Sequence, residues 1–213
     1  QTINGAYALT INTAGTTQFN GLVGNTAALS SLTTDAPGTL KFGTTLGSTD
    51  KSVITTGAQS YGDDVVLLQN TILSSTGIAP STPAGDITFG KTINGAYALT
   101  INTAGTTQFN GWVGNTAALS SLSTDSYGQT LIQGGGITTS GAQTYNDNVL
   151  LSNASSTTAL NTTNSNVYFA GTVNNQFSNA PQALTISAGS GNVTFTGAVG
   201  AASNVLGDLS INN

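Results

Sequence analysis

Hydrophobic and polar residues alternate in a short phrase that recurs along the chain. Its clearest copies place an aliphatic residue, an aromatic residue, a glycine and a second aliphatic residue at every second position: Val193, Phe195, Gly197 and Val199, and before them Val167, Phe169, Gly171 and Val173. Because successive side chains of a strand point to opposite faces, each copy predicts one strand that buries its apolar set. No stretch combines sustained 3.6-residue periodicity with capping residues, so the pattern predicts an all-β chain.

The aromatic position of the phrase returns along the whole chain. It is occupied by Phe19, Phe42, Tyr61, Phe89, Phe109, Tyr145, Phe169 and Phe195. The intervals are mostly about 20–28 residues, which suits one turn of a β-solenoid. In such a coil, equivalent residues of successive turns lie about 4.8 Å apart, so we expect these residues to form an internal core ladder. The longest interval predicts a degenerate copy near Leu131–Gln133. The predicted fold is a parallel β-helix of about nine turns.

A longer repeat encloses these turns. Residues 2–35 and 92–125 are identical at 32 of 34 positions, at an offset of 90 residues. A more divergent third copy begins at Val167, where Ala183–Ile186 matches Ala98–Ile101. We therefore expect one continuous solenoid over 1–213, with repeat units of about 1–90, 91–166 and 167–213 and four turns in each 90-residue repeat.

Charge is scarce in this chain. Only 5% of its residues are charged, three lysines against eight aspartates, and the net charge is −5. Globular domains carry about 25% charged residues, so Thr, Ser, Asn and Gln must solvate most of this surface. A chain with so few cations is a poor nucleic-acid binder, because phosphates are neutralised by Lys and Arg. No apolar run approaches the roughly 20 residues that span a bilayer, so we expect no membrane insertion.

The inventory of side chains limits the available chemistry. Without His or Cys there is no Ser-His-Asp system, no thiol nucleophile and no usual zinc site. Carboxylate pairs hydrolyse glycosides in some β-helices, but Asn148 follows Asp147 where the first repeat has Asp63 and Asp64. We therefore expect no catalytic residue, no enzyme and no cofactor.

Two kinds of residue remain as candidates for binding. Asp63, Asp64 and Asp147 stand near corners and could bind Ca²⁺ through oxygen ligands, the alternative being that they bond turn amides or water. Leu22 and Trp112 differ between the near-identical copies, and the alternation places both outward. Outward Trp112 suggests packing against a neighbouring filament or stacking on a sugar, the alternative being cover by the chain's own residues 126–136. A Thr-rich ice-binding face is a weaker alternative, since the outward threonines do not recur at one position.

Several motifs resemble those of known surface proteins. The stretch Gly191–Gly200, followed by Leu206–Ile211, and the Gly-Ala-Gln-x-Tyr motifs at Gly57–Tyr61 and Gly141–Tyr145 carry the resemblance. They are similar to repeats of filamentous-haemagglutinin-like and β-strand-repeat adhesins of bacteria. The resemblance implies a right-handed parallel β-helix on the cell surface or in the extracellular matrix, acting in adhesion or scaffolding. It carries no catalytic residue to this chain.

Two functional hypotheses follow. The first is a structural and adhesive extracellular segment of a bacterial surface or matrix fibre, with glycans or other cell-surface components as partners. The second is a self-assembling filament subunit whose copies stack end to end by β-strand addition, in an amyloid-like manner. Solenoids need polar caps at their ends, and neither terminus of this sequence contains one. We therefore expect each end to meet an adjoining repeat or another copy.

Overall fold

The computed structural model describes residues 2–43, 53–77, 84–153, 157–201 and 204–212. Within these ranges the regular elements are strands and none is a helix, as the alternation predicted. In chain order they are β1 (Ala8–Ile11), β2 (Thr16–Phe19), β3 (Ser31–Thr34), β4 (Thr39–Phe42), β5 (Val53–Thr55), β6 (Gln59–Tyr61), β7 (Asp64–Leu67), β8 (Thr71–Ser75), β9 (Ile87–Phe89), β10 (Ile93–Asn94), β11 (Ala98–Thr103), β12 (Thr106–Phe109), β13 (Ser121–Thr124), β14 (Gln129–Ile132), β15 (Gly136–Thr138), β16 (Gln143–Tyr145), β17 (Asn148–Leu151), β18 (Thr157–Asn161), β19 (Val167–Phe169), β20 (Val173–Asn175), β21 (Ala183–Ser187), β22 (Val193–Phe195) and β23 (Leu209–Asn212).

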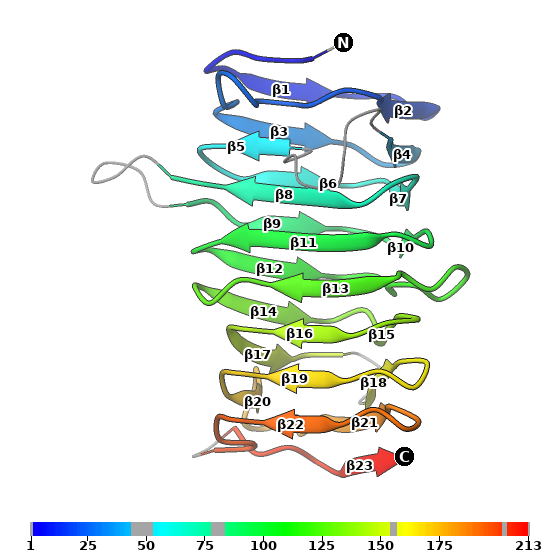
Figure 1. Ribbon diagram of the computed structural model, residues 1–213. Coiled ribbons are helices and arrows are strands. Elements are labelled where there is room, and N and C mark those ends of the chain that lie inside the picture. Colours follow the sequence, from blue (N-terminus) through cyan, green and yellow to red (C-terminus); the bar gives the residue numbers. More distant parts are fainter. Residues whose placement is uncertain (1, 44–52, 78–83, 154–156, 202–203, 213) are drawn as a thin grey trace.

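These strands form the three faces of a parallel β-solenoid (Figure 1). The rear face is the eight-stranded sheet β1-β3-β6-β9-β12-β14-β17-β20, and the front face is the seven-stranded sheet β5-β8-β11-β13-β16-β19-β22. The side face consists of β2-β4-β7-β10 and β15-β18-β21-β23, which Val113 joins through bridges to Ile93 and Ile137. The chain visits rear, side and front faces in turn, which confirms the predicted parallel solenoid.

The coil has about eight turns, close to the nine expected. In Figure 1 the strands of the rear face run rightward and those of the front face run leftward while the chain descends. Seen from the N-terminal end, such a path turns clockwise as it moves away from the viewer, and the coil is therefore right-handed. This is the usual hand of connections between parallel strands.

The 90-residue repeat is one face shorter than the four turns expected. Its first Ala-Leu-Thr-Ile segment forms β1 on the rear face, and the second copy begins β11 on the front face. On the rear face, β1 is followed by β3, β6 and β9, so three full turns separate β1 from β9. The chain then passes through β10 on the side face to β11 on the front face and stops one face short of a fourth turn. All three faces accept the same kind of strand and corner. A repeat must therefore contain a whole number of faces, but it need not contain a whole number of turns.

The third copy continues the same shift. Its Ala-Leu-Thr-Ile segment begins β21, which lies on the side face. Three copies of one segment thus occupy three different faces of the rod. Any feature that the repeats share is consequently presented in three directions around the axis.

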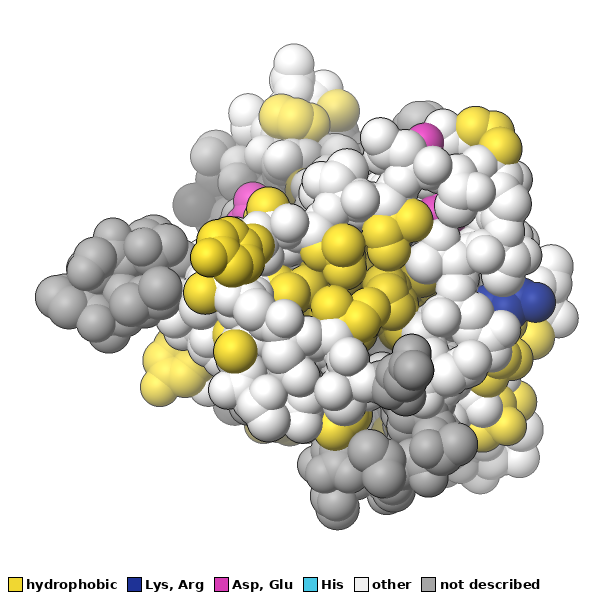
Figure 2. Space-filling model, turned by 90° about the horizontal axis from the view of Figure 1, so that it is seen from above, with side chains coloured by type: hydrophobic (Ala, Val, Ile, Leu, Met, Phe, Trp, Pro, Cys, Tyr) yellow, Lys and Arg dark blue, Asp and Glu magenta, His cyan; other side chains and the backbone are white. Residues whose placement is uncertain are grey.

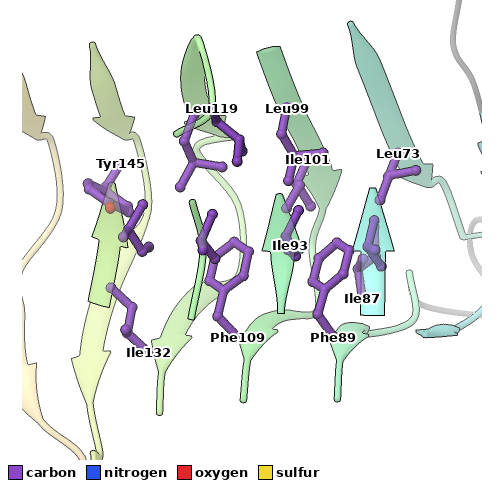
Figure 3. Packing of buried hydrophobic residues seen from close by; sticks show 14 of the residues in the cluster. Leu73, Ile87, Phe89, Ile93, Leu99, Ile101, Phe109, Leu119, Ile132 and Tyr145 are labelled. Atoms are coloured by element: carbon purple, nitrogen blue, oxygen red, sulfur yellow. The ribbon is translucent and has the colours of Figure 1, made fainter. Parts of the chain in front are cut away.

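The core fills the interior along the whole rod. Inward residues of successive strands stack in rows, and Figure 3 shows Phe89, Phe109 and Ile132 as neighbours in one of them. Parallel register pairs Phe109 with both Phe89 and Ile132. Ile132 therefore occupies the position of the degenerate copy, and the aromatic series is interrupted there.

The aromatic residues form two stacks rather than one ladder. Ring centroids 5.3–5.9 Å apart link Phe19, Phe42, Tyr61, Phe89 and Phe109 in sequence. A second stack contains Tyr145, Phe169 and Phe195, at 5.0 and 4.9 Å. All eight rings lie in or against the core, and Phe195 is only partly buried. The first stack passes from the side face to the rear face, and the second lies on the front face.

Buried polar groups explain the Gly-Ala-Gln-x-Tyr motif. The hydroxyl of Tyr145 donates to Oε1 of Gln143 at 2.9 Å, and Nε2 of Gln143 donates to the carbonyls of Ile137 and Asn161 at 3.1 and 2.9 Å. Tyr61 and Gln59 repeat the Tyr-to-Gln bond at 2.7 Å. Because a buried hydroxyl without a partner is costly, the two residues must occur together. The motif is therefore structural.

Candidate functional site

The three candidate calcium ligands lie at two separate corners. Asp63 and Asp64 stand at the start of β7, whereas Asp147 precedes β17 in a later turn. Oδ1 of Asp64 accepts hydrogen bonds from the backbone N–H and the hydroxyl of Thr92, at 3.2 and 2.6 Å. Asp64 thus ties one turn to the next. In the described ranges, no group of three or more His, Cys, Asp or Glu is placed to hold a metal ion.

Asp147 is buried, with 4% of its surface exposed. The hydroxyl of Thr124 donates to its Oδ1 at 2.9 Å, and that of Thr130 lies 3.0 and 2.9 Å from the two carboxylate oxygens. Burial raises the pKa of Asp147 to about 6, although both hydroxyls lower it. The site holds the carboxyl by neutral donors, so the group is a structural hydrogen-bonding centre.

Asp63 occupies the equivalent position with fewer partners. It is 1% exposed, and its Oδ1 has no hydrogen-bond partner among the described residues. Leu40 stands in β4 where β14 has Thr130, so the second hydroxyl donor of the later copy is missing. Burial raises the pKa of Asp63. The carboxyl of Asp147 therefore has a hydroxyl donor, Thr130, at the position where Leu40 gives Asp63 none.

Trp112 lies at the corner between the rear and side faces and is 39% exposed. Its indole lies against Gly135 and Gly136 of the next turn. A Cβ built on Gly135 would approach the indole nitrogen to 2.6 Å, and one on Gly136 would approach the ring to 2.8 Å. Gly135 also has a φ of +92°. The chain's own loop therefore covers one side of the ring, and the other side remains accessible.

Leu22 does not point to solvent, contrary to the expected alternation. Only 7% of its surface is exposed. Strand β2 ends at Phe19, and Asn20 and Gly21 begin a corner, so the two-residue period no longer determines which way the following side chains point. Residue 22 is thus removed from the candidates for surface recognition.

Other exposed aromatic residues escaped the sequence analysis. Tyr7, Tyr127 and Phe177 are 81%, 69% and 55% exposed, and all lie at corners or loops. Of these three residues, Tyr127 had the clearest indication of surface exposure in the sequence. It lies two residues beyond the end of the near-identical segment and replaces Pro37 of the first copy. A residue that changes from proline to tyrosine beside a corner glycine changes the surface rather than the core.

The apolar interior reaches the surface at both ends of the described rod. Figure 2 looks down on the N-terminal end and shows hydrophobic side chains gathered at its centre within a polar rim. Ile3 is 38% exposed there, and Thr2, Ile3, Gln18, Phe19, Asn20 and Gly21 line a hollow of about 320 Å³. At the other end, Leu209 and Ile211 of β23 are 45% and 44% exposed. Each end therefore presents a strand edge beside apolar surface.

No described segment forms a helix that is long and apolar enough to cross a membrane. Comparisons of the chain with protein-family models, with curated proteins and with solved structures give no match. Fold and surface are therefore the basis for any functional assignment. The chain is a right-handed parallel β-solenoid whose buried polar groups support the core and whose candidate surfaces are its corners and ends.

Proposed function

We propose that the chain is a structural and adhesive segment of an extracellular bacterial surface or matrix fibre, with no catalytic role. The observation that carries the proposal is the hydrophobic core, which continues from turn to turn along the described rod. A solenoid of this kind is lengthened by adding turns, because each turn contacts only its neighbours. The resemblance to filamentous-haemagglutinin-like and β-strand-repeat adhesins supports the same assignment.

The shift of the repeat by one face also supports adhesion. Related segments lie on the rear, front and side faces, so a fibre presents similar polar surfaces all around its axis. Such a rod contacts another surface whichever way it rotates. Its scarcity of charge favours contacts through hydroxyl and amide groups, which are less sensitive to salt than ion pairs.

Surface display tests this proposal. The chain is fused to a bacterial surface anchor, and retention of the cells on glycan-coated and host-cell surfaces is measured under flow. The control displays an unrelated β-solenoid of equal length at equal density. We expect greater retention with this chain and little loss in high salt. Equal retention of both strains on every surface would overturn the adhesive role.

End-to-end assembly is the second candidate, and the exposed edge of β23 favours it. Leu209 and Ile211 of that strand lie beside the open end of the core, as does Ile3 at the opposite end. A second copy would extend all three sheets and bury these side chains. We expect filaments whose growth rate rises with protein concentration, and loss of growth in Ile211→Lys. A wild-type chain that stays monomeric as its concentration is raised would exclude this function.

A further inference from the structure

A groove at the corner between the front and rear faces has the features of a ligand site. It measures about 270 Å³ and is lined by Ser74, Ser75, Thr76, Ala84, Asn102, Thr103, Ala104, Asp125 and Tyr127. Ligand pockets for drug-sized molecules are usually about 300–1,000 Å³, so this groove suits a unit the size of one sugar ring.

Hydrogen bonds within the chain fix the floor of the groove. The hydroxyl of Ser75 donates to the carbonyl of Gly57 at 2.9 Å and accepts from the N–H of Gly85 at 2.8 Å. The hydroxyl of Thr103 donates to the carbonyl of Gly85 at 2.7 Å and accepts from the N–H of Gly105 at 3.0 Å. Ser75 and Thr103 are almost fully buried. The groove is therefore preorganised, which reduces the entropy cost of binding.

Two groups of the groove retain hydrogen-bonding capacity. Oδ1 of Asp125 is buried and has no partner among the described residues, while the backbone N–H of Thr103 bonds to the same carboxylate. Asn102 uses Nδ2 in a long 3.4 Å bond to Oγ of Ser74, and no bond to its Oδ1 is present in the described part of the chain. Both free atoms are acceptors. A ligand bound here would therefore have to supply hydroxyl or amine donors to them.

Tyr127 completes the groove with an exposed ring. Its side chain is 69% exposed although it lines the site, so the ring offers an aromatic surface at the rim. Sugar rings combine hydroxyl donors with an apolar C–H face, which matches acceptors next to an aromatic ring. The groove contains a carboxylate and no lysine, so phosphates and uronic acids are disfavoured.

We propose that this groove binds a neutral sugar unit of a surface or matrix polysaccharide, with Tyr127 stacking on the ring and Asp125 and Asn102 accepting from its hydroxyls. The proposal rests on the adhesive function above and supplies one ligand class for it. The first repeat contains a natural comparison. There Asp35 accepts from the N–H of Thr13 at 2.9 Å, and Pro37 takes the place of Tyr127.

Binding to defined oligosaccharides tests the groove. The full chain is titrated with six-unit glucan, mannan and xylan oligomers, and with a galacturonan oligomer as the charged comparison, by calorimetry. We expect binding to at least one neutral oligomer and none to the galacturonan. Tyr127→Ala should weaken that binding about tenfold, the scale of one lost stacking contact, and Asp125→Asn should weaken it severalfold. Tyr7→Ala removes a more exposed tyrosine away from the groove and should leave affinity unchanged.

Several results would overturn the groove as a sugar site. The first is that no neutral oligomer binds. The second is that the Tyr127→Ala and Asp125→Asn variants bind as tightly as the unsubstituted chain. The third is that the galacturonan binds more tightly than the neutral oligomers. Tyr127→Pro, which copies the first repeat, provides a second variant should Tyr127→Ala unfold, and thermal melting verifies that each variant is folded. The surface-display assay is scored separately. Retention of displaying cells despite absent oligosaccharide binding would reject the groove alone, whereas loss of both would reject the adhesive role as well.

Discussion

Individual buried carboxyls set the pH response of this protein. Asp63, Asp125 and Asp147 all have pKa values raised chiefly by burial, and the chain contains no histidine. A carboxyl that keeps its proton in the folded state favours folding in acid. Most proteins show the opposite trend, because their carboxylates are stabilised by ion pairs.

Stability should therefore fall as pH rises. The pKa of the Asp147 carboxyl rises from its ordinary value of 3.8 to about 6 on folding. Its contribution to the free energy of unfolding is therefore fully present below pH 3.8 and is lost as the pH rises through 6. The difference corresponds to about 2–3 kcal/mol. Urea unfolding at pH 3.5, 5 and 7 measures it, and we expect the midpoint to decrease across this range. A midpoint that increases with pH would contradict the assignment.

The substitution Asp147→Asn separates the contribution of Asp147 to the pH dependence of stability from that of Asp63 and Asp125. Asparagine keeps the shape but not the charge, and the hydroxyls of Thr124 and Thr130 can reorient to bond it. We expect a higher melting temperature at pH 7 and a weaker pH dependence between pH 4 and 6. Asp208→Asn is the control, because Asp208 is exposed and should change neither quantity. An unchanged pH profile in Asp147→Asn would show that another group is responsible.

The Gln-Tyr pair gives a second prediction at this scale. Gln143→Leu should destabilise the fold by about 2–3 kcal/mol, because the buried hydroxyl of Tyr145 and the carbonyls of Ile137 and Asn161 lose their partner. Tyr145→Phe should cost only about 1 kcal/mol. The double variant should be less destabilised than the sum of the two, since one substitution removes the unsatisfied hydroxyl left by the other. Additive free energies of unfolding in urea would refute the coupling.

At the scale of elements, strands follow from the sequence far better than corners do. The two-residue alternation predicted the all-β fold because each face buries every second side chain. It failed at Leu22, where the strand has already ended, and it could not indicate that Gly135 makes room for Trp112. The groove at Tyr127 was also missed, because its walls come from strands of different turns. Corners depend on contacts between turns, and those contacts leave no local period in the sequence.

Corner glycines can be tested by substitution. Gly114 has a φ of +72°, and a Cβ there would approach the carbonyl oxygen of Thr138 to 2.1 Å. Gly114→Ala should therefore destabilise the fold by about 2–4 kcal/mol, since both the backbone conformation and the contact oppose it. Gly15 has no contact closer than 3.4 Å, so Gly15→Ala should be neutral or slightly stabilising. Equal melting temperatures of the two variants would show that turn-to-turn spacing at Gly114 is not tight.

At the scale of the whole molecule, the unit of construction is one face. The near-identical segments lie on different faces, so the sequence period did not reveal how many turns a repeat contains. The aromatic series is interrupted at Ile132, which replaces Phe42 of the first copy, and it resumes at Tyr145 on the front face. What each face requires is an inward apolar strand and a tight corner.

Excision of one repeat tests this rule directly. Deleting residues 33–122 joins Leu32 to Ser123 within the matching strands β3 and β13, so the sequence on both sides of the junction stays nearly unchanged. All following strands must then move by one face, which the rule permits. We expect a folded, shorter rod with one cooperative transition and a urea m-value reduced roughly in proportion to its length. Deleting 33–121 instead leaves one extra residue in the strand and reverses which side chains face inward. That control should aggregate or melt far lower, and equal stability of the two deletions would show that the register of faces does not control folding.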